Sequence, residues 1–467
     1  MIIFAHALAA SFLLFLAAMN IGYLVLHLDA LRPMRRGHAL RALQDLPPAY
    51  TGYEPPVSLL VPAFDEEATI ADTVRMLLDL DYPEVEIVVV NDGSADGTLA
   101  ALERAFDLEP FPEVYWRRLA TKPIRAIYRS RLKPLLRVVD KESGGRGDAL
   151  NAGINASRYP LFCAVDAHAL LHRDSLRRAA EPFLDDSRTV ASGAAIRLAN
   201  GCAIAGNRVT GVELPRSTLG MLQISEYLRT YPYARLGWAR LKGALLMSGA
   251  MAVFRKDAVV EAGGFRSETL GAATELTMRL HRLLRDRDEP YSVHFVPDAV
   301  SWNLAPEEPA ALKRQHIRRQ WGLAESLHAN SALLGARGGA SATLAYLFLL
   351  VFDCYGPLVE IAAYAFVLAM FAFGQLSGAF LAAFLLAAFA LGFLVSTSAL
   401  LLEEYSFRLY PRSEQLARLV WMAAVENLGY RQLVSWWRAI GLVQWARSRI
   451  AASAPVRRGL PGQERPW

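Results

Sequence analysis

The 467-residue chain has little cysteine. Its three cysteines, Cys163, Cys202 and Cys354, lie far apart and form no CxxC pair. A disulfide framework or a structural zinc site requires cysteines in recognisable pairs. We therefore expect neither, and the fold has to be stabilised by packing.

Charge is missing from long stretches of the chain. Residues 3–28 and 376–402 contain no Asp, Glu, Lys or Arg, and each exceeds the ~20 residues that a helix needs to cross a bilayer. Residues 342–371 are also apolar, although Gly356-Pro357 interrupts them and they include two acids, Asp353 and Glu360. We expect three membrane spans.

Arginines directly after the first apolar run indicate its orientation. Arg32, Arg35 and Arg36 follow residues 3–28, and positive charge favours the cytoplasmic side. A cleaved signal peptide is the rival interpretation, but no basic residue precedes the run and no cleavage site of the A-x-A kind is evident. We expect a retained anchor in a bacterial inner membrane, with the following domain in the cytoplasm.

The polar remainder of the chain suggests a soluble domain next to membrane helices. Charged residues make up 20% and the net charge is +5, which suits lipid or phosphorylated partners and does not by itself indicate nucleic acid; we expect no nucleic-acid partner. Tryptophans among basic residues in 415–447 are typical of an interfacial helix. The expected organisation is a membrane anchor at 1–30, a cytoplasmic linker at 31–54, a soluble domain at 55–335, transmembrane helices at 340–403, and interfacial helices with a basic tail at 404–467.

Within the soluble segment, apolar runs alternate with helical patterns. "VSLLVPAF", "VEIVVVN" and "PLFCAVDA" predict buried strands, and "EEATIADTVRMLLDL" and "GDALNAGINAS" predict helices. Residues 109–137, rich in arginine, suggest an irregular insertion. This alternation predicts an α/β fold with a mostly parallel sheet, in which ligands bind beyond the carboxyl ends of the strands.

Three motifs lie at those expected strand ends: "VPAFDEE" (61–67), "VNDGSADGT" (90–98) and "KESGGRGDALNAGI" (141–154). Each is weak alone, since Asp-Gly and Gly-Ser are ordinary turn sequences. Their order and spacing, with "SGAMAVFRKDAVVEAGGF" at 248–265 and "RQHIRRQW" at 314–321, resemble the membrane-bound family 2 glycosyltransferases. That group includes hyaluronan, cellulose, chitin and poly-N-acetylglucosamine synthases.

The resemblance implies a GT-A domain that binds a nucleotide-sugar, usually a UDP-sugar with Mn²⁺ or Mg²⁺, and transfers the sugar to a glycan or lipid-linked acceptor. Other subunits of a polysaccharide synthesis complex are possible partners, and the bilayer is another. The residues implied for the donor are Ala63, Glu66, Asp92, Gly145, Arg146, Asp166, Gln315 and Arg318. Those implied for the acceptor side are Ser248, Gly249, Ala250 and Trp321.

The metal motif departs from the family pattern. The expected Asp-x-Asp reads Asp166-Ala167-His168. Imidazole ligates Mn²⁺ well, although oxygen ligands suit Mn²⁺ and Mg²⁺ better. Asp166 and His168 are therefore either a working metal pair or the remains of one, with His168 as a surface histidine.

Two further motifs are altered. Aligning Gly271, Glu275 and Leu276 with the family's Glu-Asp segment puts Ala272 and Ala273 where the catalytic base is expected. Glu275 is the weak remaining candidate, and more in keeping with a second, structural acid. In the QxxRW motif, Arg319 takes the Trp position and Trp321 comes two residues later.

Two hypotheses follow. The chain is either an active membrane glycosyltransferase with an atypical site, or a catalytically impaired pseudo-glycosyltransferase that serves a synthase complex as scaffold or nucleotide sensor. A transporter built on Asp353 and Glu360 is disfavoured, because three spans are few and the soluble domain dominates.

Overall fold

The computed structural model describes residues 2–44, 52–335 and 339–453. The strands are β1 Val57–Ala63, β2 Val85–Asn91, β3 Leu108–Pro110, β4 Ile124–Ser130, β5 Leu136–Lys141, β6 Leu161–Val165, β7 Leu170–Leu171, β8 Thr189–Leu198, β9 Ala203–Ala205, β10 Arg208–Gly211, β11 Met251–Arg255 and β12 Ser292–Asn303. In this part of the chain, one large sheet has the order β3-β4-β5-β2-β1-β6-β11-β8-β12-β7, and β9 pairs with β10 in a separate hairpin.

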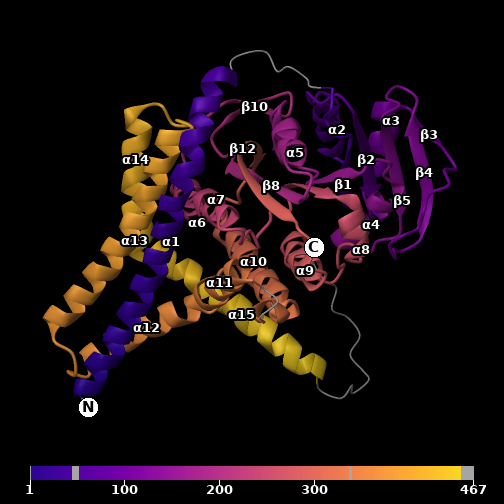
Figure 1. Ribbon diagram of the computed structural model, residues 1–467. Helices are drawn as coiled ribbons and strands as arrows, with labels where there is room; N and C mark the ends of the chain where they lie inside the picture. The colour runs from indigo at the N-terminus through magenta and orange to yellow at the C-terminus, as the bar shows by residue number, and fades with distance from the viewer. Residues whose placement is uncertain (1, 45–51, 336–338, 454–467) are drawn as a thin grey trace.

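The helices surround this sheet and extend away from it (Figure 1). They are α1 Ile2–Gln44, α2 Ile70–Leu78, α3 Thr98–Phe106, α4 Arg146–Ala156, α5 Ser175–Asp185, α6 Thr218–Thr230, α7 Pro232–Arg240, α8 Lys256–Glu261, α9 Ala272–Asp286, α10 Pro309–Ala329, η1 Ser331–Leu334, α11 Ala340–Phe348, η3 Leu349–Cys354, α12 Gly356–Ala372, α13 Gly378–Ser406, α14 Ser413–Val425, η4 Glu426–Tyr430 and α15 Arg431–Ser453. The segments η3 and η4 are π-helical.

The sheet is mixed but mostly parallel. β5, β2, β1 and β6 pair in parallel, and so do β8 and β12. β11 lies reversed between β6 and β8, which leaves those two strands pointing the same way. The expectation of a mostly parallel α/β sheet is confirmed.

Successive residues of β1 point into two different apolar cores. Leu59 and Val61 pack with α2, α3 and α5, whereas Leu60 packs with α4, α8 and α9. A strand covered by helices on both faces is apolar at nearly every position. This explains the run "VSLLVPA", in which the one hydroxyl, on Ser58, donates to Glu86 at 2.5 Å.

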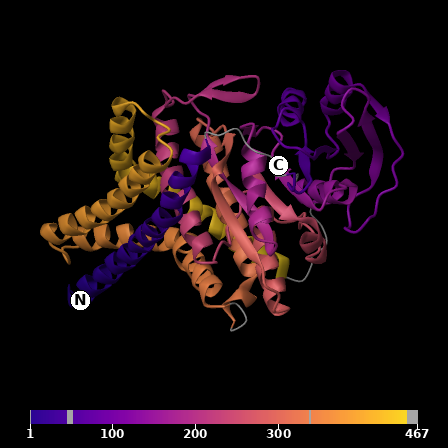
Figure 2. The same cartoon turned by 45° about the horizontal axis from the view of Figure 1, so that its top comes forward.

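The apolar helices lie to one side of the sheet. α1, α12 and α13 project away from it, and the β3–β4 edge faces the opposite direction (Figures 1 and 2). Among the described residues, Ile2–Met34 of α1 and the whole of α13 are long and apolar enough to cross a membrane. Ala340–Cys354 and α12 pass the same test together with a 43° bend, so the count reaches the expected three only if that pair is one span.

The structure changes two expectations about irregular segments. α1 continues to Gln44, so the first part of the expected linker at 31–54 is helical; residues 45–51 lie outside the described ranges, as does the tail at 454–467. Residues 109–137 are not wholly irregular, because they contain β4, which pairs antiparallel with β5. Arginines interspersed along β4 hide its strand pattern in the sequence.

A buried ion pair joins the sheet to the membrane helices. The Arg197 guanidinium on β8 lies 2.5 Å from Glu403 Oε1, near the end of α13. Tyr233 Oη on α7 donates to the other carboxylate oxygen at 2.5 Å. The Arg197 and Glu403 side chains are only 7% and 4% exposed, so neither charge has water as an alternative partner.

Replacing Glu403 should loosen this junction. Glu403→Ala leaves the Arg197 charge buried without its partner. This should lower the free energy of unfolding by about 3–5 kcal/mol. The melting temperature of the purified protein in detergent would report it. The control is Glu414→Ala, which removes the exposed Arg418–Glu414 pair on α14 and should leave the melting temperature nearly unchanged. Equal effects of the two substitutions would contradict the role of the junction.

Candidate functional site

Polar groups gather where β1, β2 and β6 end. In the sheet register, Ala63 lies opposite Asn91, and Leu60 lies opposite Ala164 just before the end of β6. Ala63 is buried, and its carbonyl accepts a hydrogen bond from the Asp92 amide at 2.9 Å. The parallel strand order thus brings the ends of β1, β2 and β6, with Asp92 and Asp166, to one edge of the sheet, as the sequence predicted.

Asp92 anchors the glycine-rich loop that precedes α4. Its carboxylate accepts from Lys141 Nζ at 2.5 Å and from the amides of Gly144 and Gly145 at 3.1 and 2.7 Å. Lys141 is fully buried and also lies 2.6 Å from Asp148 Oδ1. These contacts fix the loop at the sheet edge. The predicted contact of Asp92 with a nucleobase stays a prediction, and it would have to share this carboxylate with the loop.

Two glycines allow the loops to meet. Gly145, the N-cap of α4, has φ 91°, a conformation that side chains with a Cβ rarely adopt. A Cβ on Gly93 would lie 2.7 Å from the Ser143 amide nitrogen. The turn after β2 and the turn before α4 can therefore come together only with glycine at these positions.

Arg146 bridges the strand edge and a second segment. Its NH1 lies 2.5 Å from Asp166 Oδ1, and its NH2 donates to the Gly249 carbonyl at 2.7 Å. The side chain is 41% exposed, so solutes can reach the guanidinium. Arg146 is also the first residue of α4, where free backbone amides and the helix dipole favour an anion. Together these features suit the oxygens of a phosphate group.

Asp166 and His168 offer part of a metal site. The His168 side chain is 59% exposed, and its Nδ1 lies 3.7 Å from Glu66 Oε1. Among the described residues, no group of three or more His, Cys, Asp or Glu side chains is placed to hold a metal. One carboxylate and one imidazole are ligand types that Mn²⁺ accepts. The donor chemistry therefore fits an ion whose other ligands come from diphosphate and water.

Glu275 is a structural residue rather than an open carboxylate. It is fully buried in α9, and its Oε2 accepts from Arg279 NH2 at 2.7 Å. Arg266 NH1 lies 3.4 Å from its other oxygen. Both oxygens therefore face guanidinium groups, as expected for a second, structural acid. The weak candidacy of Glu275 as a catalytic base stays a prediction. Ala272 and Ala273 begin the same helix.

The acceptor-side residues come from two segments. Ser248 is buried, and its Oγ accepts from the Ala250 amide at 3.1 Å. Gly249 contacts Arg146 through its carbonyl, as described above. On α10, Gln315 and Arg318 are exposed and Trp321 is partly buried. Their predicted contacts with diphosphate and acceptor stay predictions.

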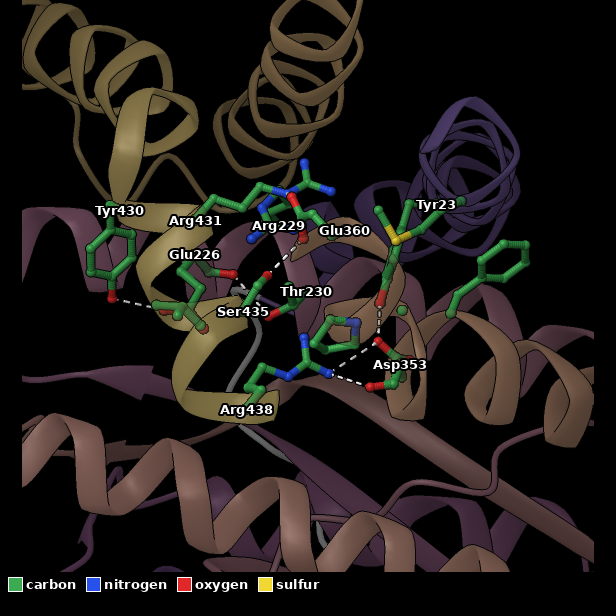
Figure 3. Close-up of a pocket in the computed structure, with 15 residues that line it drawn as sticks. Tyr23, Glu226, Arg229, Thr230, Asp353, Glu360, Tyr430, Arg431, Ser435 and Arg438 are labelled. Atoms are coloured by element: carbon green, nitrogen blue, oxygen red, sulfur yellow. Dashed lines mark hydrogen bonds and ion pairs between the residues drawn. The ribbon is translucent and has the colours of Figure 1, made fainter. Parts of the chain in front are cut away.

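A polar cavity of about 40 Å³ lies between the membrane helices (Figure 3). Tyr23 Oη on α1 donates to Asp353 at 2.6 Å, and Arg431 Nε lies 3.2 Å from Glu360 Oε1. Tyr430 Oη donates to Glu226 at 2.9 Å. The sequence singled out Asp353 and Glu360 as acids within an apolar segment. It did not reveal their partners, Tyr23 of α1 and Arg431 of α15.

The cavity lies beside a break in the apolar helices. Gln320 on α10 donates from Nε2 to the carbonyls of Asp353 and Cys354 at 3.0 and 2.8 Å. Arg438 on α15 donates to the Asp353 carbonyl at 2.6 Å. Pro357 has no amide for the Asp353 carbonyl, and the Leu358 amide, which could reach the Cys354 carbonyl, donates to Tyr355 instead. Side chains from α10 and α15 therefore complete the backbone hydrogen bonding at the bend.

Two sequence models of known families match the chain. The model described as glycosyl transferase family 2 matches residues 58–261, and the one described as glycosyl transferase family group 2 matches residues 162–401. The second match covers just over half of the 467 residues. The matched region includes the strand edge, the acceptor-side segment and α10.

Individual relatives share about a quarter of the matched residues with this chain. The chain is 25% identical over 264 residues to a poly-beta-1,6-N-acetyl-D-glucosamine synthase of Staphylococcus epidermidis, a match that covers 56% of this chain and 53% of the relative. The synthase of Staphylococcus aureus strain COL is 26% identical over 263 residues, with the same coverage. The chain thus spans about half the length of the curated relatives it matches. Among solved structures, the mannosyltransferase PcManGT of Pyrobaculum calidifontis, in complex with GDP-Man and Mn²⁺, aligns with a TM-score of 0.49 at 21% identity, covering 89% of this chain and 99% of that one.

Substituting Glu275 separates a structural from a catalytic role. Glu275→Gln keeps the shape but removes the charge that Arg279 and Arg266 share, which should cost about 1.5–3 kcal/mol of stability. Thermal unfolding of the purified protein measures this loss. An unchanged melting temperature together with abolished turnover would contradict the structural role. Glu289→Gln, at an exposed acid just after α9, is the matched control.

Proposed function

Because the chain belongs to glycosyl transferase family 2, we propose that it is a membrane glycosyltransferase that takes its sugar from a nucleotide-sugar, by preference a UDP-sugar. The acceptor is a growing surface polysaccharide or another glycan or lipid-linked molecule. The relatives named as polysaccharide synthases support such a product. The observation that carries the proposal is the Arg146–Asp166 pair at the carboxyl edge of the sheet.

The donor lies along this edge. Ala63, Glu66 and Asp92, after β1 and β2, face the nucleoside, while Gly145 and Arg146 face the diphosphate. Arg146 also holds the Gly249 carbonyl, so one guanidinium positions both the leaving group and the acceptor-side segment. From α10, Gln315 and Arg318 contribute polar groups to the diphosphate. Trp321 of the same helix offers an aromatic surface to a sugar ring.

The reaction is an inverting displacement. The acceptor hydroxyl attacks the anomeric carbon as the bond to the diphosphate breaks. Arg146 stabilises the negative charge that develops on the leaving oxygen, because a guanidinium fixed at a helix start is already oriented for it. Asp166 and His168 would hold a divalent ion, Mn²⁺ or Mg²⁺, whose charge would offset part of the charge on the diphosphate.

A specific observation also supports a second function. Ala272 and Ala273 occupy the expected base position, and Glu275 is held in the core. Loss of a general base alone lowers a rate by about 10²–10⁴-fold. A pseudo-glycosyltransferase that binds a nucleotide-sugar as scaffold or sensor of a synthase complex would keep the donor edge and lose turnover. A neighbouring gene with intact motifs would favour this alternative.

We place the protein in a bacterial inner membrane, with more than one membrane-crossing segment. The support is the pair of apolar helices, Ile2–Met34 and α13, and the arginines that follow the first apolar run. Positive charge at that point favours a cytoplasmic location for the sheet, where nucleotide-sugars are available.

Arg146→Ala tests the donor site directly. Loss of a charge-assisted hydrogen bond of about 1.5–3 kcal/mol should weaken binding of UDP by roughly 10- to 150-fold, measured by titration calorimetry in detergent. Arg75→Ala on α2, whose partner is Asp72, removes an exposed arginine elsewhere and serves as control. If Arg146→Ala binds every UDP- and GDP-nucleotide tested as well as the native protein does, the proposed donor edge is wrong.

His168→Ala tests the metal pair. In the native protein, Mn²⁺ should increase nucleotide affinity, since an ion held by Asp166 and His168 would offset the diphosphate charge. In the variant this increase should disappear, while the affinity without metal stays the same. His172→Ala is the matched control, because His172 is paired with Asp174 at 2.5 Å. A Mn²⁺ effect that survives in His168→Ala would remove His168 from the site.

A further inference from the structure

One face of α10 carries groups that suit the acceptor. Arg318, Trp321, Gly322 and Glu325 are spaced by three and four residues, which places them together on one side of a helix. Gln320 points to the other side, toward the helix break at Asp353. We call the four residues the acceptor face of α10. It combines a cation, an aromatic ring and a carboxylate.

The acceptor face packs closely against the start of α9. A Cβ on Gly322 would lie 2.8 Å from the Gly271 amide nitrogen, and one on Gly271 would lie 3.0 Å from the Gly322 carbonyl oxygen. Both glycines are therefore required for the backbones to approach so closely. The contact brings α10 next to Ala272 and Ala273, the first residues of α9.

Glu325 lies at this contact. Its Oε2 accepts a hydrogen bond from the Leu270 amide at 3.2 Å, two residues before α9 begins. The side chain is partly buried. Burial raises the pKa of Glu325, the neighbouring acids Glu268 and Glu275 raise it further, and the Leu270 amide and Arg449 of α15 act in the opposite direction. A carboxylate with a raised pKa is a stronger proton acceptor than an ordinary surface acid.

The same region contacts the donor edge. Thr274 Oγ1, in the first turn of α9, donates to the Met247 carbonyl at 3.2 Å, and two residues later the Gly249 carbonyl accepts from Arg146. A Cβ on Gly147, next to Arg146, would lie 2.7 Å from the Arg266 carbonyl oxygen. The start of α9 thus contacts the same segment, 247–249, that Arg146 holds, and Glu325 contacts the loop just before α9.

We propose that Glu325 supplies the catalytic carboxylate that Ala272 and Ala273 lack, an inference that rests on the proposed glycosyl transfer. The acceptor oxygen forms a bond to the anomeric carbon, and the bond from that carbon to the diphosphate oxygen breaks. The diphosphate leaves with the bonding electron pair. The hydroxyl proton passes to the Glu325 carboxylate and from there to solvent.

Two other acids of this region fit less well. Glu275 is buried between Arg279 and Arg266. Glu268 is exposed on the loop before α9, so it lacks the burial that would strengthen a base. Because Glu268 also acts on the pKa of Glu325, the control is Glu289, an exposed acid just after α9 that is not placed in the site.

The experiment compares Glu325→Gln with Glu289→Gln in the full-length protein, in lipid nanodiscs. Sugar transfer is assayed with a panel of UDP- and GDP-sugars, and binding of UDP and GDP is measured in parallel. In Glu325→Gln, kcat should fall by about 10²–10⁴-fold, with nucleotide affinity and melting temperature unchanged. The rise of kcat with pH that follows ionisation of Glu325 should also disappear. Glu289→Gln should behave as the native protein does.

A rescue makes the assignment specific. Adding Ala273→Asp to Glu325→Gln returns a carboxylate to the start of α9 and should restore part of kcat. If Glu325→Gln does not fold, Glu325→Asp keeps the charge but withdraws the carboxylate by one methylene, and it should lower kcat at unchanged nucleotide affinity. Native-like kcat in the variant that folds would overturn the role of Glu325 and leave the proposed function standing. Nucleotide binding without transfer by the native protein would instead overturn both, in favour of the scaffold or sensor.

Discussion

The arrangement of this protein depends on charges that are buried at the junction between its sheet and its membrane helices. Arg197 of β8 meets Glu403 of α13, and Tyr233 of α7 completes the coordination of that carboxylate. A second pair, Arg229 Nε and Glu426 Oε1 at 2.8 Å, joins α6 to the start of η4. A buried charge is tolerated only beside its partner, so each pair fixes one position of the sheet relative to the helices. The site on α9 and α10 is built on that fixed frame.

Local patterns in the sequence were sufficient to predict the centre of the sheet. β1, β2 and β6 are mostly apolar because helices cover both faces, with Ser58, Glu86 and Asn91 as polar exceptions, and an aspartate follows each strand within two residues. β4 was missed, since arginines alternate with its apolar residues at the sheet edge. The helical continuation of α1 to Gln44 was missed as well, because a polar helix and a polar linker have similar compositions.

The site was predictable only where one segment carries the information. The Asp166 position follows from the end of β6, and the glycine-rich loop predicts a bend before α4. The residues that contact these positions could not be predicted from the sequence. Lys141 holds Asp92 from a neighbouring strand, and Glu325 reaches Leu270 from 55 residues away in sequence. Such contacts result from how elements pack, which no periodicity within a single segment encodes.

The broken apolar helix has a mechanical consequence for the site. Gln320 and Arg438 satisfy the carbonyls that the Gly356-Pro357 step leaves free, and Gln320 belongs to the same helix as Trp321 and Glu325. α10 therefore contacts the bend through Gln320 and the loop before α9 through Glu325. Any change in the 43° angle between the two apolar helices would have to be accommodated where α10 meets α9.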